Sequence, residues 1–201
     1  FKEKFGTPRQ PHLVPGATAR LKIKKGFIPE QSLKGLAEFS HVWLLSFFHL
    51  NTNKSFKSTV HPPRLQGKTV GVFASRSPHR PSPIGLSLAR IEKIEGDTLH
   101  LSGIDLVDGT PILDIKPYIP GCDIVSHARA GWTERIDQKE FKVELTEVAK
   151  EDLRRLGGAE ARKLTRLVDE VLRHDPRNPR DKSQLAEGKD PRRDIPFALF
   201  T

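Results

Sequence analysis

The sequence has no methionine, one cysteine and one tyrosine among its 201 residues. Its single thiol, Cys122, excludes an internal disulfide framework and fits a reducing compartment, so we expect a cytoplasmic protein. No apolar run reaches the roughly 18 residues that span a bilayer, and no signal peptide is visible. The lack of methionine, including an initiator, predicts that the chain starts inside a longer reading frame or has lost its ends.

Several common signatures of binding or catalysis are also missing. No G-x-G-x-x-G follows a strand-like segment, so a dinucleotide-type site has no support in the sequence. No G-x-S-x-G occurs, which argues against a serine hydrolase. The spacing of His41, His49, His61 and His79 is not that of zinc ligands, so no metal site is predicted. His41 and His49 lie in an apolar run, where a buried, hydrogen-bonded packing role is expected.

Basic side chains outnumber acidic ones, 34 against 25, which gives a formal charge of +9. Nucleic acid is the commonest partner of such a surface. An anionic membrane surface is the rival, but the chain lacks the basic amphipathic helix or lipidation motif that would support it. A basic surface that is only solvated stays open as a third interpretation.

Short strand-like segments dominate the first 145 residues. Apolar residues take every second position in Ala17–Ile23, as in a strand with one buried face, whereas Val42–Phe48 is typical of a strand covered on both faces. Many short strands without long helices between them favour an antiparallel barrel or sandwich. Further strands are predicted at Val70–Ala74, Leu86–Ile94, Thr98–Ser102 and Phe141–Leu145, with a hairpin turn at Glu95–Asp97 and a short helix at Leu33–Ala37.

The apolar period becomes helical in the last quarter of the chain. Val148–Leu156 predicts a short helix that breaks at Gly157-Gly158, and Leu164–Leu172 predicts a second helix before Asp175-Pro176. We therefore predict a mainly β fold with some α-helix. A small antiparallel β-barrel would occupy residues 1–145, and a small α/β, basic appendage would occupy residues 146–201.

A proline-rich loop separates two of the predicted strands. Pro78, Pro81 and Pro83 end the first strand and stiffen the connection. Side chains fixed on a stiff loop suit the binding of anions or carboxylates, because little conformational entropy remains to be lost. A surface connection without a function is the plainer alternative. The polar side chains on this loop are those of Arg76, Ser77, His79 and Arg80.

A second motif follows the turn at Asp108-Gly109. In the alternating strand after it, Asp114, Lys116 and Tyr118 share one face. This set is a candidate functional group. An edge strand with a solvated face, in which Asp114 and Lys116 form an ion pair that closes the barrel, is the structural alternative.

These passages resemble the TsaA-like, TrmO-type tRNA methyltransferase family. The similarity runs over about residues 1 to 120 and involves several motifs in the same order, which is far more specific than a short glycine pattern. The motifs are Lys2–Pro11, Phe39–Leu45, Pro62–Arg64, Gly71–Ser87 and Gly103–Tyr118.

The resemblance implies a small β-barrel enzyme that uses S-adenosylmethionine to methylate N6 of a threonylcarbamoyl-modified adenosine beside the anticodon of tRNA. It also implies a homodimer whose active site lies near the subunit interface, and one more barrel strand before Phe1. The residues onto which it carries cofactor binding are Gln10, Pro11, His12, Asn51, Thr52, Arg76, Leu86, Asp108, Gly109, Thr110, Pro111 and Ile112.

The remaining site residues are assigned by the chemistry that such a reaction needs. An exocyclic adenine amine is a weak nucleophile, so methyl transfer depends on alignment and on a route for the departing proton. We expect Asp114 or Tyr118 to accept a hydrogen bond from the amine, and Lys116 to set their protonation or to meet phosphate. Arg64, Arg80 and Arg177 are expected to contact the RNA substrate.

A noncatalytic RNA-binding or protein-interaction β-barrel is the alternative function. The joint presence of Arg76, Asp108, Gly109, Thr110 and Lys116 favours the enzyme, because a bare binding module does not need that combination.

Overall fold

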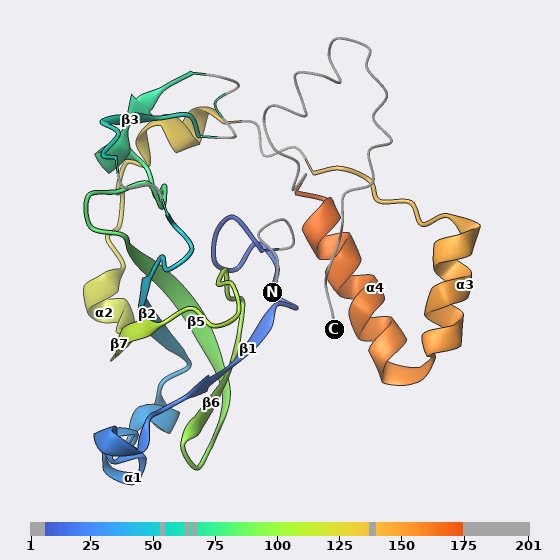
Figure 1. Ribbon diagram of the computed structural model, residues 1–201, viewed down its shortest axis with the longest axis horizontal. Helices are drawn as coiled ribbons and strands as arrows, with labels where there is room; N and C mark the ends of the chain where they lie inside the picture. Colours follow the sequence, from blue (N-terminus) through green and yellow to red (C-terminus); the bar gives the residue numbers. More distant parts are fainter. Residues whose placement is uncertain (1–6, 53–54, 63–64, 66–67, 137–139, 175–201) are drawn as a thin grey trace.

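An antiparallel sheet of five strands forms the centre of the molecule, in the order β1-β6-β5-β2-β7 (Figure 1). The computed structural model describes residues 7–52, 55–62, 65, 68–136 and 140–174. The strands are β1 (Thr18–Lys22), β2 (His41–Phe47), β3 (Thr59–Val60), β4 (Val70–Gly71), β5 (Ile84–Glu95), β6 (Thr98–Ser102) and β7 (Ile112–Pro117). The helices are α1 (Pro29–Ser32), α2 (Pro120–Asp123), α3 (Glu147–Leu156) and α4 (Gly158–Leu172).

The predicted mainly β, antiparallel class is confirmed, but the described strands do not close into a barrel. Within the part of the chain that the structure describes, β1 and β7 are each paired on one side only, so the sheet is open. β3 and β4 pair separately as a two-stranded ribbon. The hairpin between β5 and β6 is confirmed, with Gly96 at a φ of 57°.

Three local predictions are wrong, and in the first two a hydrogen bond from outside the predicted strand takes a backbone group. The strand predicted at Val70–Ala74 ends after Gly71, and a 3₁₀ turn follows because side chains of the proline-rich loop bond the Val72 carbonyl. Phe141–Leu145 is irregular, since the Phe141 N–H donates to the Arg173 carbonyl at the end of α4. In place of a helix at Leu33–Ala37, the chain forms α1 and a 3₁₀ turn.

Burial along β2 differs from the prediction that both faces are covered. Val42, Leu44 and Ser46 are buried, whereas Phe47 is 40% exposed and the intervening residues are half-buried. One face of β2 therefore belongs to the core. The opposite face, called the outer face below, consists of the side chains of β2, β5 and β7 that point away from the core.

The helices α3 and α4 form a pair beside the sheet, with α4 between the sheet and α3 (Figure 1). Leu167 and Val171 of α4 belong to the same hydrophobic core as Val14 and the buried residues of β2, β5 and β6. The predicted break at Gly157-Gly158 is confirmed, and none of the described helices has both the length and the apolarity to cross a membrane.

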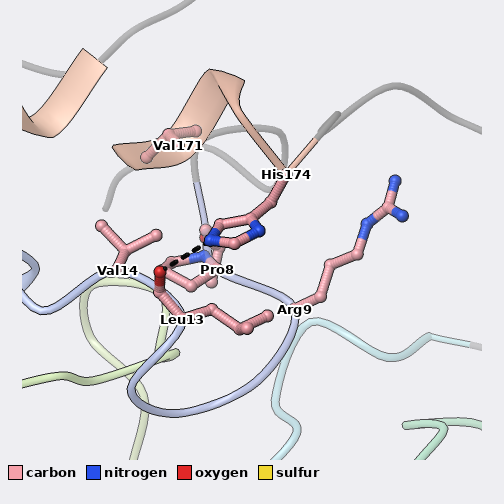
Figure 2. Close-up of a pocket in the computed structure, with 7 residues that line it drawn as sticks. Pro8, Arg9, Leu13, Val14, Val171 and His174 are labelled. Atoms are coloured by element: carbon pink, nitrogen blue, oxygen red, sulfur yellow. Dashed lines mark hydrogen bonds between the residues drawn. The ribbon is translucent and has the colours of Figure 1, made fainter. Parts of the chain in front are cut away.

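Polar contacts fix α4 to the segment before β1. The Gly16 N–H donates to Glu170 Oε2 at 2.7 Å, and His174 Nε2 donates to the Leu13 carbonyl at 3.0 Å. Figure 2 shows this second bond beside a small hollow that is also lined by Arg9, Val14 and Val171. The segment held in this way directly follows Gln10–His12.

Candidate functional site

The Arg80 side chain stabilises the proline-rich loop through contacts with the same segment of the chain. Its Nη1 donates to the carbonyls of Ser75, at 2.7 Å, and Val72, at 3.1 Å. Its guanidinium also lies 5.8 Å from the centre of the Phe73 ring. Such contacts leave the loop little freedom, so the predicted stiffness is present and Arg80 has a structural role beside the RNA contact proposed for it.

Side chains from two segments distant in the sequence also donate hydrogen bonds to the backbone around this loop. The Asn51 side chain donates to the Pro78 carbonyl at 2.8 Å, and the Trp132 indole N–H donates to the Ala74 carbonyl at 2.7 Å. Asn51 thus positions the loop that carries Arg76. Trp132 could not be predicted from the sequence, because an indole in an irregular segment gives no signal of its partner.

The structure brings Arg76 to the first motif of the chain. Arg76 is exposed, and its Nη1 donates to Gln10 Oε1 at 3.2 Å across 66 residues of sequence. His12 has a positive φ of 63°, and its N–H donates to the Gly103 carbonyl at 2.9 Å. A Cβ atom on Gly103 would lie 2.9 Å from His12 Nδ1, so glycine is needed for this approach. Three residues assigned to the cofactor therefore gather at the end of β6.

Asp105 lies in the same region and was absent from the predicted site. Ser87 Oγ donates to Asp105 Oδ1 at 2.5 Å. Burial raises the pKa of Asp105, and the hydrogen bond from Ser87 and the nearby Arg76 and His12 oppose that rise. In the sequence, Asp105 looks like one more polar residue before a turn, and only the fold places it beside Arg76.

The turn at Asp108-Gly109 is fixed to the end of β2. Gly109 has a φ of 72°, which glycine adopts without strain. Both the N–H and the hydroxyl of Thr110 donate to the Val107 carbonyl, at 3.2 and 2.6 Å. The Phe47 N–H donates to the Pro111 carbonyl at 2.9 Å, so the turn has a defined position relative to the sheet.

Asp114 and Lys116 share the outer face, as predicted. They lie opposite Leu45 and Trp43 of β2, and their charged groups form an ion pair of 2.9 Å. The hydrogen bond from Lys116 is the main reason why the pKa of Asp114 is lowered. Asp114 is therefore ionised, so it can accept a hydrogen bond but is a weak base. The ion pair of the structural alternative is present, and both side chains remain open to solvent.

Aromatic rings connect this face to the cofactor residues. Tyr118 meets Trp43 edge-on at a centroid distance of 5.8 Å and His41 at 6.3 Å, and His41 lies 5.6 Å from His12. Asp123 of α2 holds the row in place, because its Oδ2 accepts the Trp43 indole N–H at 3.1 Å. The row therefore runs from a residue assigned to the cofactor to one assigned to the substrate.

His41 is a further candidate within that row. Burial lowers its pKa most, followed by the charges of His12 and Arg90, so the ring is neutral near pH 7. Its Nδ1 lies 2.8 Å from Ser40 Oγ. The expected hydrogen-bonded packing role agrees with these contacts, but a neutral imidazole on the outer face can also accept a proton.

The remaining predicted residues are placed as follows. Leu86 is 51% exposed on the outer face, opposite Leu45, and Thr52 is exposed beyond Asn51. Arg64 and Arg177 lie outside the described residues. Over the described part of the chain, no group of three histidine, cysteine or acidic side chains has an arrangement that could hold a metal ion.

Comparison with known proteins gives consistent matches. The family model described as the tRNA-methyltransferase O N-terminal domain matches residues 1–124. A mouse protein named tRNA (adenine(37)-N6)-methyltransferase is 56% identical over 125 residues, which cover 61% of this chain and 29% of that protein. The chain thus spans less than a third of the mammalian relative's length.

Bacterial relatives match over more of their length. An Escherichia coli protein, also named tRNA (adenine(37)-N6)-methyltransferase, is 40% identical over 184 residues, or 88% of this chain and 77% of that protein. The crystal structure of TrmO from Pseudomonas aeruginosa has a TM-score of 0.70 at 40% identity, and the match covers 89% of this chain and 77% of that one. The likeness therefore includes the helical segment after residue 145.

Proposed function

The chain belongs to the tRNA-methyltransferase O family, and on that premise we propose that it is an S-adenosylmethionine-dependent enzyme that methylates N6 of adenosine 37 in tRNA. The observation that carries this proposal is the 40% identity, over 88% of the chain, to an Escherichia coli protein named for that reaction. The finer substrate in the proposal is the threonylcarbamoyl-modified form of the adenosine, and the net charge of +9 supports an RNA partner.

The residues around Arg76 fit the cofactor by their chemistry. A guanidinium held beside Gln10 suits the methionine carboxylate, and the exposed backbone of the Gly109 turn suits the edge of the adenine. S-adenosylmethionine supplies an electrophilic methyl group on a sulfonium, and the protein supplies the geometry. Pro11, Thr52, Leu86 and Asp108 complete the proposed cofactor set.

The outer face would receive the adenosine. Ionised Asp114 accepts a hydrogen bond from the N6 amine, and Lys116 keeps Asp114 ionised while its remaining donors face phosphate. Tyr118 offers a ring edge and a hydroxyl between His41 and Trp43 in the aromatic row, and neutral His41 can accept the departing proton. Arg64, Arg80 and Arg177 are proposed to contact the RNA.

Conservative variants test the roles of Asp114 and Tyr118. We expect Asp114→Asn to lower the single-turnover methylation rate by about 10- to 100-fold, because a hydrogen bond to a charged group contributes about 1.5–3 kcal/mol. Tyr118→Phe removes a neutral hydroxyl and should lower the rate by about 2- to 10-fold. Glu144→Gln, on an exposed carboxylate paired with Lys142 at 2.7 Å, is the matched control. Unchanged rates in both site variants would rule the assignment out.

We propose that the apolar end of the outer face, where β2 and β5 carry Phe47 and Ile84, is where two copies of the chain meet in a homodimer. Phe47 and Ile84 lie opposite each other in β2 and β5 and are 40% and 47% exposed, next to Leu86 at 51%. Neighbouring exposed apolar side chains form a contiguous patch, and such patches mark interaction surfaces. A second copy seated there would lie beside Asp114 and Lys116.

The expected result for Ile84→Asp is a shift from dimer to monomer in light scattering, because a charge would enter an apolar interface. Phe27→Asp is the control, since Phe27 is 68% exposed on a 3₁₀ turn outside β2, β5 and β7. A monomeric wild-type protein, or an unchanged mass for Ile84→Asp, would contradict the proposed interface.

The proposed organisation is a catalytic unit over residues 1–145 followed by a basic, helical appendage over 146–201. A tRNA substrate and a single, exposed Cys122 also support a cytoplasmic location.

The decisive experiment supplies labelled S-adenosylmethionine and tRNA transcripts with and without threonylcarbamoyl adenosine. Nuclease digestion and mass spectrometry then locate the label. Methylation of the modified adenosine alone supports the enzyme and its prerequisite. Cofactor binding without transfer to either RNA would favour the noncatalytic RNA-binding barrel or a different methyl acceptor.

A further inference from the structure

The carboxyl group of Asp105 lies in the region where the proposed cofactor residues meet. It follows β6 and is held by Ser87, which lies on the buried side of β5 opposite Leu44. The short hydrogen bond fixes one carboxylate oxygen and thereby the orientation of the group. The reaction chemistry described above gives Asp105 no role.

Two opposite charges lie close together here without pairing. Arg76 is near enough to act on Asp105 electrostatically, as is His12. Arg76 nevertheless donates to the neutral side chain of Gln10, and the structure shows no ion pair between Arg76 and Asp105. Each charge is therefore left to meet a ligand group of the opposite sign.

We propose that Asp105 and Arg76 together bind the α-amino acid end of S-adenosylmethionine, with Asp105 taking the ammonium and Arg76 the carboxylate. The inference rests on the proposed function. An α-amino acid presents both charges on one carbon atom, so a carboxyl group and a guanidinium that lie close together without forming an ion pair match it. Partial burial of Asp105 strengthens the contact, because water screens it less.

Ionisation of Asp105 lowers the stability of the folded protein, and this effect can be measured without ligand. The pKa of Asp105 is raised in the folded protein, so the folded state holds the proton more tightly than the unfolded chain. Ionisation at neutral pH therefore opposes folding, and this effect is absent at a pH below the unfolded value. Asparagine keeps an oxygen for Ser87 and removes the charge, so the thermal midpoint of ligand-free Asp105→Asn at pH 7 should equal or exceed that of the wild type.

The test measures by calorimetry the affinity of the full chain for three ligands. S-adenosylhomocysteine carries the whole amino acid, decarboxylated S-adenosylmethionine keeps only the ammonium, and 5′-methylthioadenosine lacks both groups. We expect Asp105→Asn to raise the Kd of the first two by about 10- to 100-fold and to leave that of methylthioadenosine within about twofold. Arg76→Gln should weaken only the first.

Asp97→Asn is the matched control, because Asp97 also accepts a hydroxyl hydrogen bond, from Thr98 at 2.7 Å, but lies in the β5–β6 hairpin turn. Unchanged binding of S-adenosylhomocysteine by Asp105→Asn would overturn the inference. Equal weakening of all three ligands would also overturn it, since Asp105 would then act through the fold. Failure of the wild-type protein to bind any of the three would overturn the proposed function itself.

Discussion

Replacing Arg76 by glutamine is expected to raise the Kd for S-adenosylhomocysteine by about 10- to 150-fold, because a hydrogen bond to a charged group contributes about 1.5–3 kcal/mol. Arg76 is exposed and donates only to Gln10 among the described residues, so its loss leaves no buried partner unsatisfied. The thermal midpoint should therefore stay within about 1 °C, as for other surface substitutions. Calorimetry and thermal unfolding measure the two quantities on the same samples.

Glutamine substitutions at two other arginines test whether the loss of affinity is specific to Arg76 or follows from any loss of positive charge. Arg20→Gln, on the exposed side of β1, should change neither affinity nor stability. Arg80→Gln removes one hydrogen bond to each of the carbonyls of Val72 and Ser75, so its thermal midpoint should fall by a few degrees. An unchanged affinity for Arg76→Gln would remove Arg76 from the cofactor site.

The elements that could be predicted from the sequence depend on neighbours in the sequence. The β5–β6 hairpin follows from two alternating segments around Glu95–Asp97, and α3 begins directly after Thr146, whose side chain accepts the Ala149 N–H. For the hairpin and for the start of α3, the residues that form the hydrogen bonds lie within the sequence pattern itself. The shared face of Asp114 and Lys116 is predictable for the same reason, because the period of a strand alone fixes it.

The parts that could not be predicted depend on partners far along the chain. Val72 has the composition of a strand residue, but Arg80 and Ser75 take its carbonyl. Phe47 looks like part of a run buried on both sides, yet the outer face of β2 is open in the single chain. Asp105 becomes a site residue only through Ser87, 18 residues earlier, and through Arg76.

The helical segment after residue 145 should unfold together with the sheet. Leu167 of α4 is 6% exposed and packs in the core that contains Val14 and Leu101. A buried Leu→Ala change costs about 2–5 kcal/mol through lost transfer energy and a cavity. We expect Leu167→Ala to lower the midpoint of a single thermal transition by about 4–20 °C, at about 2–4 °C per kcal/mol for a chain of this size.

The Leu167→Ala substitution should also weaken cofactor binding, because α4 holds the segment that follows Gln10–His12. Glu170 and His174 bond Gly16 and Leu13, so a looser α4 leaves that segment less well placed, and the KM for S-adenosylmethionine should rise with little change in kcat. Leu156→Ala, at the 49% exposed end of α3, is the control and should cost under about 1 kcal/mol. Two separate transitions in Leu167→Ala, with the later one at the wild-type temperature, would show instead that the helices fold as an independent appendage and that the sheet alone shapes the cofactor site.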